Sequence, residues 1–460
     1  MSRTYHITTY GCQMNKNDSE RIAGVFAFMG FEPAAHESEA DIIVVNTCSV
    51  RQSAEERIFG SQEKYLEYKR VRPDMLVAIT GCLPGRDKRK EFLPRMKAVD
   101  LYFPTADMVK LPEWIRELRP GWFDRHAEEG ENTSKILRLT QGDEGDYLTI
   151  PPQRTSPFQT FVTIQTGCNK YCAYCVVPYA RGFETCRSVK DVLAECRDAI
   201  AKGAVELTLL GQSVNSFRAS DPETFAKENP FHDHFAALLW EVNQLPGLER
   251  LQWTSAHPMS MTDEVIAALA LPKQANFLHL PVQSGSDEVL RRMNRKYTRE
   301  QYLEIMRKIK EARPGMALGT DIIVGFPGET DEQFEETLSL YREVGFDISY
   351  NAQYSPRSGT LAWKIFPDDV SKEEKRGRWD KLQEVMSEIV LQKNQAFQGK
   401  EVAVLVERVE KGMASGNSAE MKLVQFPCED ASLVGKIVGV KVVDAQAWVL
   451  RATSPQPSPS

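Results

Sequence analysis

The chain opens with short apolar runs separated by longer segments of helical periodicity. Tyr5–Thr9, Asp41–Asn46 and Leu76–Thr80 are predicted strands, and the second is almost pure Ile and Val in its interior. Asp18–Phe28 and Arg51–Lys69 lie between them and are predicted helices. Strands that alternate with helices form parallel sheets covered by helices on both faces. We therefore expect an N-terminal α/β domain built on a parallel sheet.

A second and longer series of strands and helices begins near Thr160. The predicted strands are Phe161–Gln165, Glu206–Leu210, Arg250–Trp253, Phe277–His279, Ala317–Val324 and Ile348–Tyr354. The predicted helices are Val189–Lys202, Phe235–Asn243, Thr262–Ala268, Arg299–Ala312, Asp331–Val344 and Lys372–Gln398. About six βα units indicate a partial (β/α)6 barrel with its active-site loops at the C-terminal ends of the strands.

The pattern changes again after Lys400. Short β-branched runs separated by Gly, Asn and Pro predict a small β-barrel from Glu401–Val406, Lys422–Phe426, Lys436–Val443 and Trp448–Arg451. Between the two βα regions the pattern is weak, with one candidate helix at Asp107–Leu118 and then many charges, glycines and prolines. The expected domains are therefore 1–120, a linker at 121–157, 158–398, 399–453, and a disordered tail at 454–460.

Composition narrows the classes of protein that fit. The chain has 460 residues, of which 42% are hydrophobic and 26% charged, as in a soluble globular protein. No apolar stretch is long enough to span a membrane and no signal peptide is evident, so the nine cysteines are expected to be reduced, in a cytoplasmic protein. The net charge of -7 means that any nucleic-acid site must be a local basic patch. The candidates, each of which can also be an ordinary solvated helix face, are residues 86–90, 291–296 and 307–310.

Three cysteines at C-x3-C-x2-C spacing follow the first strand of the second series. They are Cys168, Cys172 and Cys175, with Tyr174 just before the third. Thiolates so close in sequence converge from one loop on a single soft metal centre. A zinc knuckle would need a fourth ligand, and no Cys or His follows at zinc spacing; three unrelated buried thiols are the other alternative. Three thiolates would leave one iron of a 4Fe-4S cluster open to a small molecule.

Three other cysteines follow the three N-terminal strands. Cys12, Cys48 and Cys82 each lie just past the C-terminal end of a predicted strand. These ends gather at one edge of a parallel sheet, so the three cysteines are expected to meet in space and form a second three-thiolate site. The alternative is that each is a small buried residue that closes a tight turn.

Longer motifs around these cysteines resemble the radical S-adenosylmethionine superfamily and, within it, the radical methylthiotransferases. The resemblance covers residues from about Thr4 to Ala452, and the C-terminal part resembles a TRAM domain. The motifs lie at 10–15 (Tyr-Gly-Cys-Gln-Met-Asn), 46–51 (Asn-Thr-Cys-Ser-Val-Arg), 81–82 (Gly-Cys), 175–182 (Cys-Val-Val-Pro-Tyr-Ala-Arg-Gly), 210–215, 279–286 and 321–330. They are most similar to the branch of the family that acts on N6-isopentenyladenosine in tRNA.

The resemblance implies a two-cluster enzyme. Cys168, Cys172 and Cys175 would hold the 4Fe-4S cluster that cleaves S-adenosylmethionine to a 5'-deoxyadenosyl radical. The other three cysteines would hold an auxiliary 4Fe-4S cluster that supplies the methylthio group. Two molecules of S-adenosylmethionine would be used to methylthiolate C2 of N6-isopentenyladenosine at position 37, in the tRNA anticodon loop. An electron donor such as flavodoxin or ferredoxin and a monomeric enzyme are also expected.

Other site residues are weaker candidates. Those expected to contact S-adenosylmethionine are Tyr174, Gln212, Asn215, Gln283, Gly325 and Phe326, although Asn and Gln at strand ends are as often simple caps and the glycine as often a structural turn. His257 and His279 are expected to be structural, and Arg181 to contact a phosphate, a carboxylate or a helix end. No catalytic triad or paired carboxylates are evident, so no catalytic residue is expected beyond the cluster ligands.

The sequence departs from the family pattern in three places, and two alternative functions stay open. Thr166 stands where the family commonly has Glu, the residues after Cys82 are unusual, and the TRAM-like segment carries as many acidic as basic residues. Related enzymes use the same chemistry on threonylcarbamoyladenosine in tRNA or on an aspartate of a ribosomal protein. A non-catalytic electron carrier or iron–sulfur sensor is the alternative from another class, but such carriers ligate each cluster with four protein groups rather than three.

Overall fold

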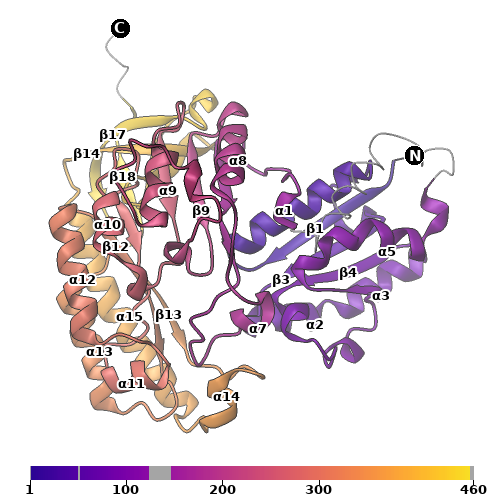
Figure 1. Ribbon diagram of the computed structural model, residues 1–460, viewed down its shortest axis with the longest axis horizontal. Coiled ribbons are helices and arrows are strands. Elements are labelled where there is room, and N and C mark those ends of the chain that lie inside the picture. Colours follow the sequence, from indigo (N-terminus) through magenta and orange to yellow (C-terminus); the bar gives the residue numbers. More distant parts are fainter. Residues whose placement is uncertain (1, 50–51, 124–146, 456–460) are drawn as a thin grey trace. The chain divides into compact units, whose positions relative to one another are not determined.

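The structure is a computed structural model that describes residues 2–49, 52–123 and 147–455. The chain divides into two compact units, each described here by itself (Figure 1). The N-terminal unit comprises Met1–Thr155, Thr166–Tyr171 and Cys175–Thr185. The C-terminal unit comprises Ser156–Gln165, Cys172–Tyr174 and Cys186–Ser460.

The N-terminal unit is built on a parallel sheet, as expected. Its five strands are β1 (Thr4–Tyr10), β2 (Glu32–Pro33), β3 (Ile42–Thr47), β4 (Leu76–Gly81) and β5 (Leu101–Tyr102), in the order β2-β1-β3-β4-β5. Side chains of β3 alternate between the two faces. Ile42 and Val44 pack with α1 (Gln13–Phe28) and α5 (Leu111–Leu118), whereas Ile43 and Val45 pack on the other face with α2 (Gln52–Gly60) and α3 (Gln62–Val71). The sheet is therefore buried on both faces, which explains its uninterrupted apolar strands.

Two of the predicted N-terminal helices were wrong in extent. Helix α1 begins at Gln13, five residues before the predicted start at Asp18, with Cys12 as its N-cap. Its first turns bury Asn15, Asn17 and Asp18, so no apolar periodicity marks them. The predicted helix Arg51–Lys69 is interrupted at Ser61 and forms α2 and α3 instead.

Part of the predicted linker belongs to the core of the N-terminal unit. Residues 124–146 of that linker lie outside the described residues. The short 3-10 turn η5 (Tyr147–Thr149) and Ile150 are buried against α1 and the sheet. The buried Arg21 of α1 donates from Nη1 to the carbonyls of Leu148 (2.8 Å) and Ile150 (2.5 Å), which fixes this segment.

The C-terminal unit carries six parallel strands in two adjoining sheets, which confirms the expected partial barrel. The strands are β6 (Gln159–Thr163), β9 (Glu206–Leu210), β10 (Arg250–Trp253), β11 (Phe277–His279), β12 (Ala317–Val324) and β13 (Ile348–Gln353). The orders are β10-β9-β6 and β11-β12-β13, and a parallel bridge joins Leu251 of β10 to Gln274, just before β11. Helices cover the outside of these strands (Figure 1).

The outer helices begin where the sequence places capping residues. The helices are α8 (Val189–Ala201), α9 (His234–Asn243), α10 (Asp263–Ala268), α12 (Arg299–Ala312), α13 (Asp331–Val344) and α15 (Lys372–Gln395). Thr298, Thr330 and Ser371 form capping boxes with the Gln or Glu three residues later. Each box satisfies two backbone N–H groups that have no acceptor within the helix. These signals explain why α12 and α13 have the predicted bounds.

The small C-terminal barrel is closed, in the order β14-β15-β16-β18-β17. Its strands are β14 (Glu401–Glu410), β15 (Met413–Ser418), β16 (Leu423–Pro427), β17 (Ile437–Ala445) and β18 (Leu450–Ala452). Strand β15 was not predicted because Ala, Ser, Gly and Asn give it little β-propensity. It needs a small residue at Gly416, since a Cβ there would lie 1.8 Å from the Leu405 carbonyl oxygen.

Buried ion pairs join the small barrel to the N-terminal ends of the (β/α)6 strands. Asp347, just before β13, binds Lys422 at 2.9 Å and Lys393 at 2.6 Å. Arg250, at the start of β10, pairs with Glu206 and donates to the carbonyl of Asn417 at 3.0 Å. The small barrel therefore lies at the strand ends opposite to the loops that follow β9, β12 and β13.

Across the described ranges, no helix combines the length and apolar character needed to cross a bilayer.

Candidate functional site

The sheet of the N-terminal unit brings three cysteine-bearing strand ends into register. Tyr10 of β1 is opposite Thr47 of β3, and Thr47 is opposite Gly81 of β4. Cys48 and Cys82 come directly after β3 and β4, and Cys12 comes two residues after β1. The Cys48 amide also donates to the Tyr10 carbonyl at 2.7 Å. The expected gathering of these loops at one edge of the sheet is therefore observed.

Two buried asparagines tie the loops of Cys12 and Cys48 together. Asn15 accepts at Oδ1 from the Cys12 amide at 3.3 Å and donates from Nδ2 to Asn46 Oδ1 at 3.1 Å. Asn46 donates back to the carbonyl of Asn15 at 2.8 Å. Both side chains are fully buried, so this exchange satisfies groups that would otherwise be costly to desolvate. It gives the asparagines of the Gly-Cys-Gln-Met-Asn and Asn-Thr-Cys motifs a physical role.

Two glycines make room for this network. A Cβ on Gly11 would lie 2.3 Å from Asn15 Oδ1. Gly81 has φ +102, and a Cβ there would lie 2.3 Å from the Thr47 carbonyl oxygen and 2.6 Å from Asn46 Oδ1. Larger residues would push the three cysteine loops apart, so glycine is required at position 11, before Cys12, and at position 81, before Cys82.

The thiol of Cys82 is buried beside a cation. Burial raises its pKa, and Cys12 and Asp18 act in the same direction, whereas Arg181 opposes them through its charge and a hydrogen bond. Arg181 pairs with Asp18 at 2.5 Å, so of the partners expected for this arginine the carboxylate is the one found. A buried thiol that can ionise only with help from a positive partner suits a ligand of an iron cluster.

The loop of Cys168, Cys172 and Cys175 is held by local hydrogen bonds. Gly167 has φ +73, and a Cβ there would lie 1.9 Å from the Phe183 carbonyl oxygen. The Cys168 amide donates to the Gly182 carbonyl at 3.2 Å, and the Val177 amide donates to Cys175 Sγ at 3.4 Å. These contacts fix the loop at both ends within the N-terminal unit.

Cys172 accepts a hydrogen bond from a buried arginine of the C-terminal unit. Arg295 donates from Nη1 to Cys172 Sγ at 3.3 Å, from Nη2 to the Pro281 carbonyl at 2.7 Å and from Nε to the Tyr297 hydroxyl at 2.9 Å. Burial lowers the pKa of Arg295, but Tyr297, Tyr174 and Cys172 outweigh it and hold the guanidinium charged. Neither Arg295 nor its role was predicted from the sequence, where it is one of several arginines in a basic run.

The thiols themselves are not assembled into a metal site. Among the residues that the structure describes, no three His, Cys, Asp or Glu side chains stand in metal-ligating geometry. The donor set nevertheless fits an iron–sulfur cluster, because soft thiols are grouped by threes on loops with buried cationic neighbours. The six ligand assignments stay predictions.

Of the residues expected to contact S-adenosylmethionine, Gln212 is placed most favourably. Gln165 accepts at Oε1 from the amides of Gln212 (2.9 Å) and Ser213 (3.2 Å), which holds the loop after β9. Gln212 Oε1 is buried and has no hydrogen-bond partner in the described structure, as an acceptor awaiting a ligand would be.

Asn215 and Gln283 are used by the fold. Asn215 donates from Nδ2 to the carbonyl of His257 at 3.0 Å and accepts from its amide at 2.8 Å, so it braces that loop. Gln283 has φ +73 and bonds β12 through its backbone to Asp321 and Ile323. Their side-chain roles toward S-adenosylmethionine stay predictions.

Tyr174, Gly325 and Phe326 gather at one apolar cluster. Phe326 is buried against Tyr354 and Phe366, and Tyr174 packs against the same cluster. Gly325 has φ +69, its amide donates to Glu329 at 2.6 Å, and a Cβ on it would lie 2.3 Å from Lys375 Cγ. The structural turn therefore accounts for Gly325 without a ligand.

The histidines have structural partners, as expected. His257 Nδ1 accepts from the Met259 amide at 3.3 Å, and its ring packs edge-on to Tyr297. His279 Nε2 lies 3.0 Å from Asp321 Oδ1.

Several other polar residues have buried side-chain atoms without a hydrogen-bond partner, and the sequence did not indicate them. Within the described ranges, Gln165 Nε2, Gln252 Nε2 and Asn351 Oδ1 have no hydrogen-bond partner. Gln252 lies within β10 and Asn351 within β13.

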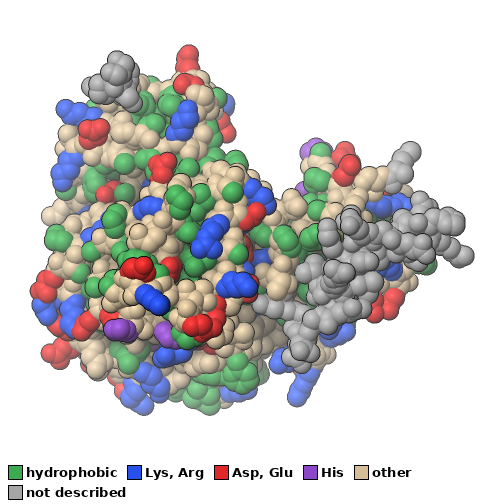
Figure 2. Space-filling view, turned by 45° about the horizontal axis from the view of Figure 1, so that its top comes forward, with side chains coloured by type: hydrophobic (Ala, Val, Ile, Leu, Met, Phe, Trp, Pro, Cys, Tyr) green, Lys and Arg blue, Asp and Glu red, His purple; other side chains and the backbone are tan. Residues whose placement is uncertain are grey.

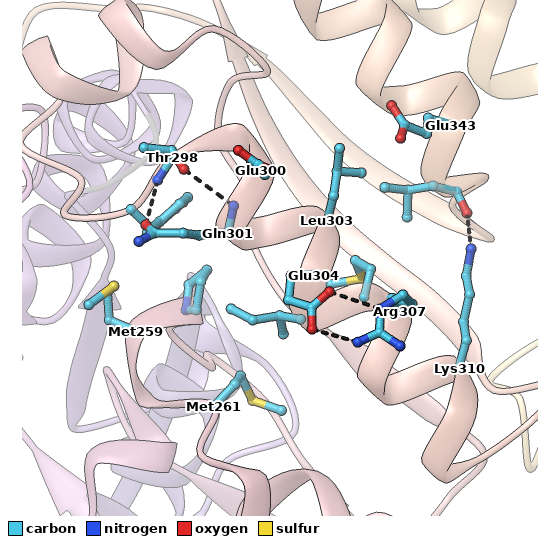
Figure 3. Close-up of a pocket in the computed structure, with 15 residues that line it drawn as sticks. Met259, Met261, Thr298, Glu300, Gln301, Leu303, Glu304, Arg307, Lys310 and Glu343 are labelled. Carbon is cyan, nitrogen blue, oxygen red and sulfur yellow. Dashed lines mark hydrogen bonds and ion pairs between the residues drawn. The ribbon is translucent and has the colours of Figure 1, made fainter.

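An open groove of about 1020 Å³ elsewhere on the C-terminal unit is not the site. It is lined by Met259, Met261 and residues of α12, and none of the residues predicted to bind a cluster or S-adenosylmethionine lines it. Figure 3 shows that Glu304 and Arg307, and Thr298 and Gln301, pair with each other rather than point free into the groove.

Comparison with known families divides the chain into three matches. Residues 162–341 match the radical SAM superfamily, residues 4–104 match an uncharacterised protein family, UPF0004, and residues 395–454 match the TRAM domain.

Curated relatives match almost the whole chain. Proteins named tRNA-2-methylthio-N(6)-dimethylallyladenosine synthase from Clostridium novyi and Clostridium perfringens (strain SM101) are 38% and 40% identical, over 98% and 97% of this chain and 96% and 97% of their own. The relative of that name from Geobacillus kaustophilus is 40% identical over 97% of this chain and 81% of its own.

Solved structures share the fold at low identity. The radical S-adenosylmethionine methyltransferase TsrM from Kitasatospora setae, with cobalamin and a 4Fe-4S cluster bound, aligns with a TM-score of 0.51 and 15% identity over 90% of this chain and 81% of its own. A second TsrM structure, with tryptophan and a SAM analogue, gives 0.52 over 76% and 73% of the two chains at 15% identity.

Proposed function

The chain belongs to the radical S-adenosylmethionine methylthiotransferase family that includes the tRNA-2-methylthio-N(6)-dimethylallyladenosine synthases, and we propose that it methylthiolates tRNA. The reaction is insertion of a methylthio group at C2 of N6-isopentenyladenosine at position 37, next to the anticodon. High identity along the full length to relatives of this name supports this substrate over threonylcarbamoyladenosine or a ribosomal-protein aspartate.

The radical SAM domain implies a 4Fe-4S cluster and S-adenosylmethionine. We assign this cluster to Cys168, Cys172 and Cys175, and an auxiliary 4Fe-4S cluster to Cys12, Cys48 and Cys82. When bound, the first supplies the electron that cleaves S-adenosylmethionine and the second supplies the sulfur. Three thiols at register-equivalent strand ends of one sheet are the observation that carries the auxiliary assignment.

The protein's own side chains do the holding and positioning. Asn15 and Asn46 fix the loops of Cys12 and Cys48, and Arg295 donates to Cys172 from a buried position. Gln212 presents an unsatisfied acceptor for S-adenosylmethionine. None of these groups needs to transfer a proton to the reacting carbon.

A tRNA substrate is implied by the relatives and by the TRAM domain. An anticodon loop suits such an enzyme because its bases can leave the stack and be read individually. Much of the basic charge is already paired: Arg291 with Glu288, Arg307 with Glu304 and Lys422 with Asp347. On the face that Figure 2 shows, basic and acidic side chains are likewise interspersed rather than gathered in one field. RNA binding is therefore expected to rest on few phosphate contacts and a shallow salt dependence.

A flavodoxin or ferredoxin as electron donor, a monomeric enzyme and a cytoplasmic location complete the proposal. The radical SAM chemistry supports the electron donor and a tRNA substrate supports the cytoplasmic location, whereas the monomeric state stays a prediction from the sequence. We keep the domain limits expected from the sequence, 1–120, 158–398 and 399–453, and add residues 147–150 of the predicted linker to the N-terminal domain.

The test uses anaerobically reconstituted full-length protein with a reductant, S-adenosylmethionine and an anticodon stem-loop that carries N6-isopentenyladenosine. We expect about eight irons per chain and the 2-methylthio nucleoside by mass spectrometry. Cys12→Ala and Cys172→Ala should each lose about half the iron and all product, whereas Cys428→Ala, outside both sets, should lose neither.

The outcomes separate the parts of the proposal. Product only from a stem-loop with threonylcarbamoyladenosine would replace the substrate and keep the chemistry. About four irons or fewer in the fully reconstituted parent would remove the sulfur-donor role from Cys12, Cys48 and Cys82.

A further inference from the structure

The segment after Cys175 ends in an arginine that lies at the other set of cysteines. Helix α7 (Val177–Arg181) begins two residues after Cys175. Arg181 is buried, with 4% of its side chain exposed, and pairs at 2.5 Å with Asp18, of which 1% is exposed. Asp18 belongs to α1, the helix whose N-cap is Cys12. Arg181 also donates to the Tyr147 hydroxyl at 3.4 Å.

The same guanidinium reaches Cys82. The charge of Arg181 acts on the Cys82 thiol, so the guanidinium lies within electrostatic range of it. One planar group therefore joins α1, the Cys82 loop and the η5 turn, as the several donors of a guanidinium allow. A lysine, with a single nitrogen, could satisfy only part of this set.

The backbone is shaped to let α7 approach the Cys82 loop. The short helix α4 (Cys82–Arg86) packs against α7. A Cβ on Gly85 would lie 2.2 Å from the Ala180 carbonyl oxygen and 3.2 Å from Ala180 Cα. Any side chain at position 85 would hold α7 away, so this glycine sets how close Arg181 comes to Cys82.

We propose that Arg181 is a positioning residue of the sulfur-donor site, and that the site is complete only when α7, which follows Cys175, is docked on α4. The inference rests on the proposed auxiliary cluster at Cys12, Cys48 and Cys82. Helix α7 follows the loop that carries Cys175 and packs on the helix that begins at Cys82. A displacement of one of these loops therefore displaces the other. A cation beside the Cys82 thiolate stabilises the ligand charge, as outer-shell partners of metal ligands do.

The test isolates the auxiliary cluster in full-length protein. The parent carries Cys168→Ala, Cys172→Ala and Cys175→Ala, so that only the other three cysteines can load iron. It should bind about four irons per chain, and iron release to a chelator is then timed after reconstitution. In this parent we expect Arg181→Lys and Gly85→Ala each to release iron about tenfold faster, the lower end of the effect of removing an outer-shell partner.

Controls separate a local effect from misfolding. Arg250→Lys alters another buried arginine ion pair, in the C-terminal unit, and should leave the release rate unchanged. Gly60→Ala adds a Cβ where nothing lies within 4 Å and is the matched control for Gly85→Ala. Near-ultraviolet circular dichroism and thermal unfolding of each variant show whether it is folded.

Failure of the two proposals is distinguishable. If the parent binds no iron, the auxiliary cluster and the proposed function are wrong. If the parent binds about four irons but Arg181→Lys and Gly85→Ala, both folded, release it at the parent rate, the role of Arg181 is overturned. Because neither Arg181→Lys nor Gly85→Ala changes the net charge, an effect seen in both variants reports the position of the guanidinium rather than the charge of the protein.

Discussion

Asn15 and Asn46 exchange hydrogen bonds across two neighbouring strand ends, with Asn15 Nδ2 3.1 Å from Asn46 Oδ1 and Asn46 Nδ2 2.8 Å from the Asn15 carbonyl. Asn15 lies three residues after Cys12, and Asn46 two residues before Cys48. The pair fixes the separation of two predicted cluster ligands by contacts between neutral, fully buried groups. It therefore holds the loops in place before any metal is bound.

We expect Asn46→Ala to destabilise the protein by about 1–3 kcal/mol, because it leaves the buried Asn15 amide with only its 3.4 Å hydrogen bond to the Thr47 carbonyl. It should also lower the iron retained at Cys12, Cys48 and Cys82. Denaturant unfolding and iron content measure the two effects. Asn394→Ala, which removes a buried amide that bonds the Gln446 and Ala447 carbonyls, should cost similar stability and no iron. Normal iron in Asn46→Ala would limit the pair to stability.

Arg295→Met should make the cluster at Cys168, Cys172 and Cys175 harder to reduce. The buried guanidinium donates to Cys172 Sγ at 3.3 Å, and its charge favours the more negative reduced state. We expect the midpoint potential to fall by about 60 mV or more, a tenfold change for a one-electron couple. A redox titration followed by electron paramagnetic resonance measures it, in a variant that lacks Cys12, Cys48 and Cys82.

Arg313→Met is the matched control for Arg295→Met. Like Arg295, Arg313 donates to the backbone, to the carbonyls of Leu269 and Gln274, but no contact of it with a cysteine is present among the described residues. An equal fall in potential in both variants would mean that the effect is not due to the contact with Cys172.

Gly167→Ala should displace Cys168 and prevent loading of the cluster on its loop. The added Cβ would lie 1.9 Å from the Phe183 carbonyl oxygen, and residue 167 has a left-handed φ of +73. Gly182→Ala carries the same kind of backbone strain (φ +78) but meets nothing within 4 Å. The visible absorbance of the reconstituted cluster should therefore be lost in Gly167→Ala and largely kept in Gly182→Ala. Equal loss in both would assign the defect to backbone strain rather than to the clash.

Asp347 should make the attachment of the small barrel sensitive to acid. Burial raises the pKa of Asp347, but Lys422 and Lys393 outweigh it and hold that pKa below its usual value. Burial lowers the pKa of Lys422, although the charge of Asp347 acts in the opposite direction. The ammonium group of this pair is therefore partly desolvated. Because the folded pKa of the carboxyl is depressed, its stabilisation is complete above about pH 4 and is lost as the pH falls through the folded value.

Asp347→Asn should cost about 3–5 kcal/mol of unfolding free energy at neutral pH, since it leaves two lysines without their buried partner. The difference from the parent should shrink as the pH falls below about 4, measured by denaturant unfolding at successive pH values. Asp263→Asn, at an exposed pair with Lys308, should cost less than about 1 kcal/mol at any pH. A difference that stays constant into acid would contradict the assignment to Asp347.

Elements with strong local signals could be predicted from the sequence. β9, β10, β11, β12, α12 and α13 have the expected bounds, because apolar runs mark buried strands and Thr with a later Gln marks each helix start. The start of α1 and strand β15 were missed, since their residues are chosen for tertiary contacts: buried polar groups in α1, and a close approach to β14 at Gly416.

The sequence by itself determined the family and the residues that are predicted to carry the chemistry. Spacing grouped Cys168, Cys172 and Cys175, strand ends grouped Cys12, Cys48 and Cys82, and the family followed from the motifs around them. The spatial partners of these residues were decided only by the tertiary structure: Asn46 for Asn15, Arg181 for Cys82 and Arg295 for Cys172. Spacing along the sequence shows only which residues are brought together by one loop or by one edge of a sheet. A side chain that arrives from 31, 99 or 123 residues away leaves no periodic trace in the sequence, because its partner is set by packing.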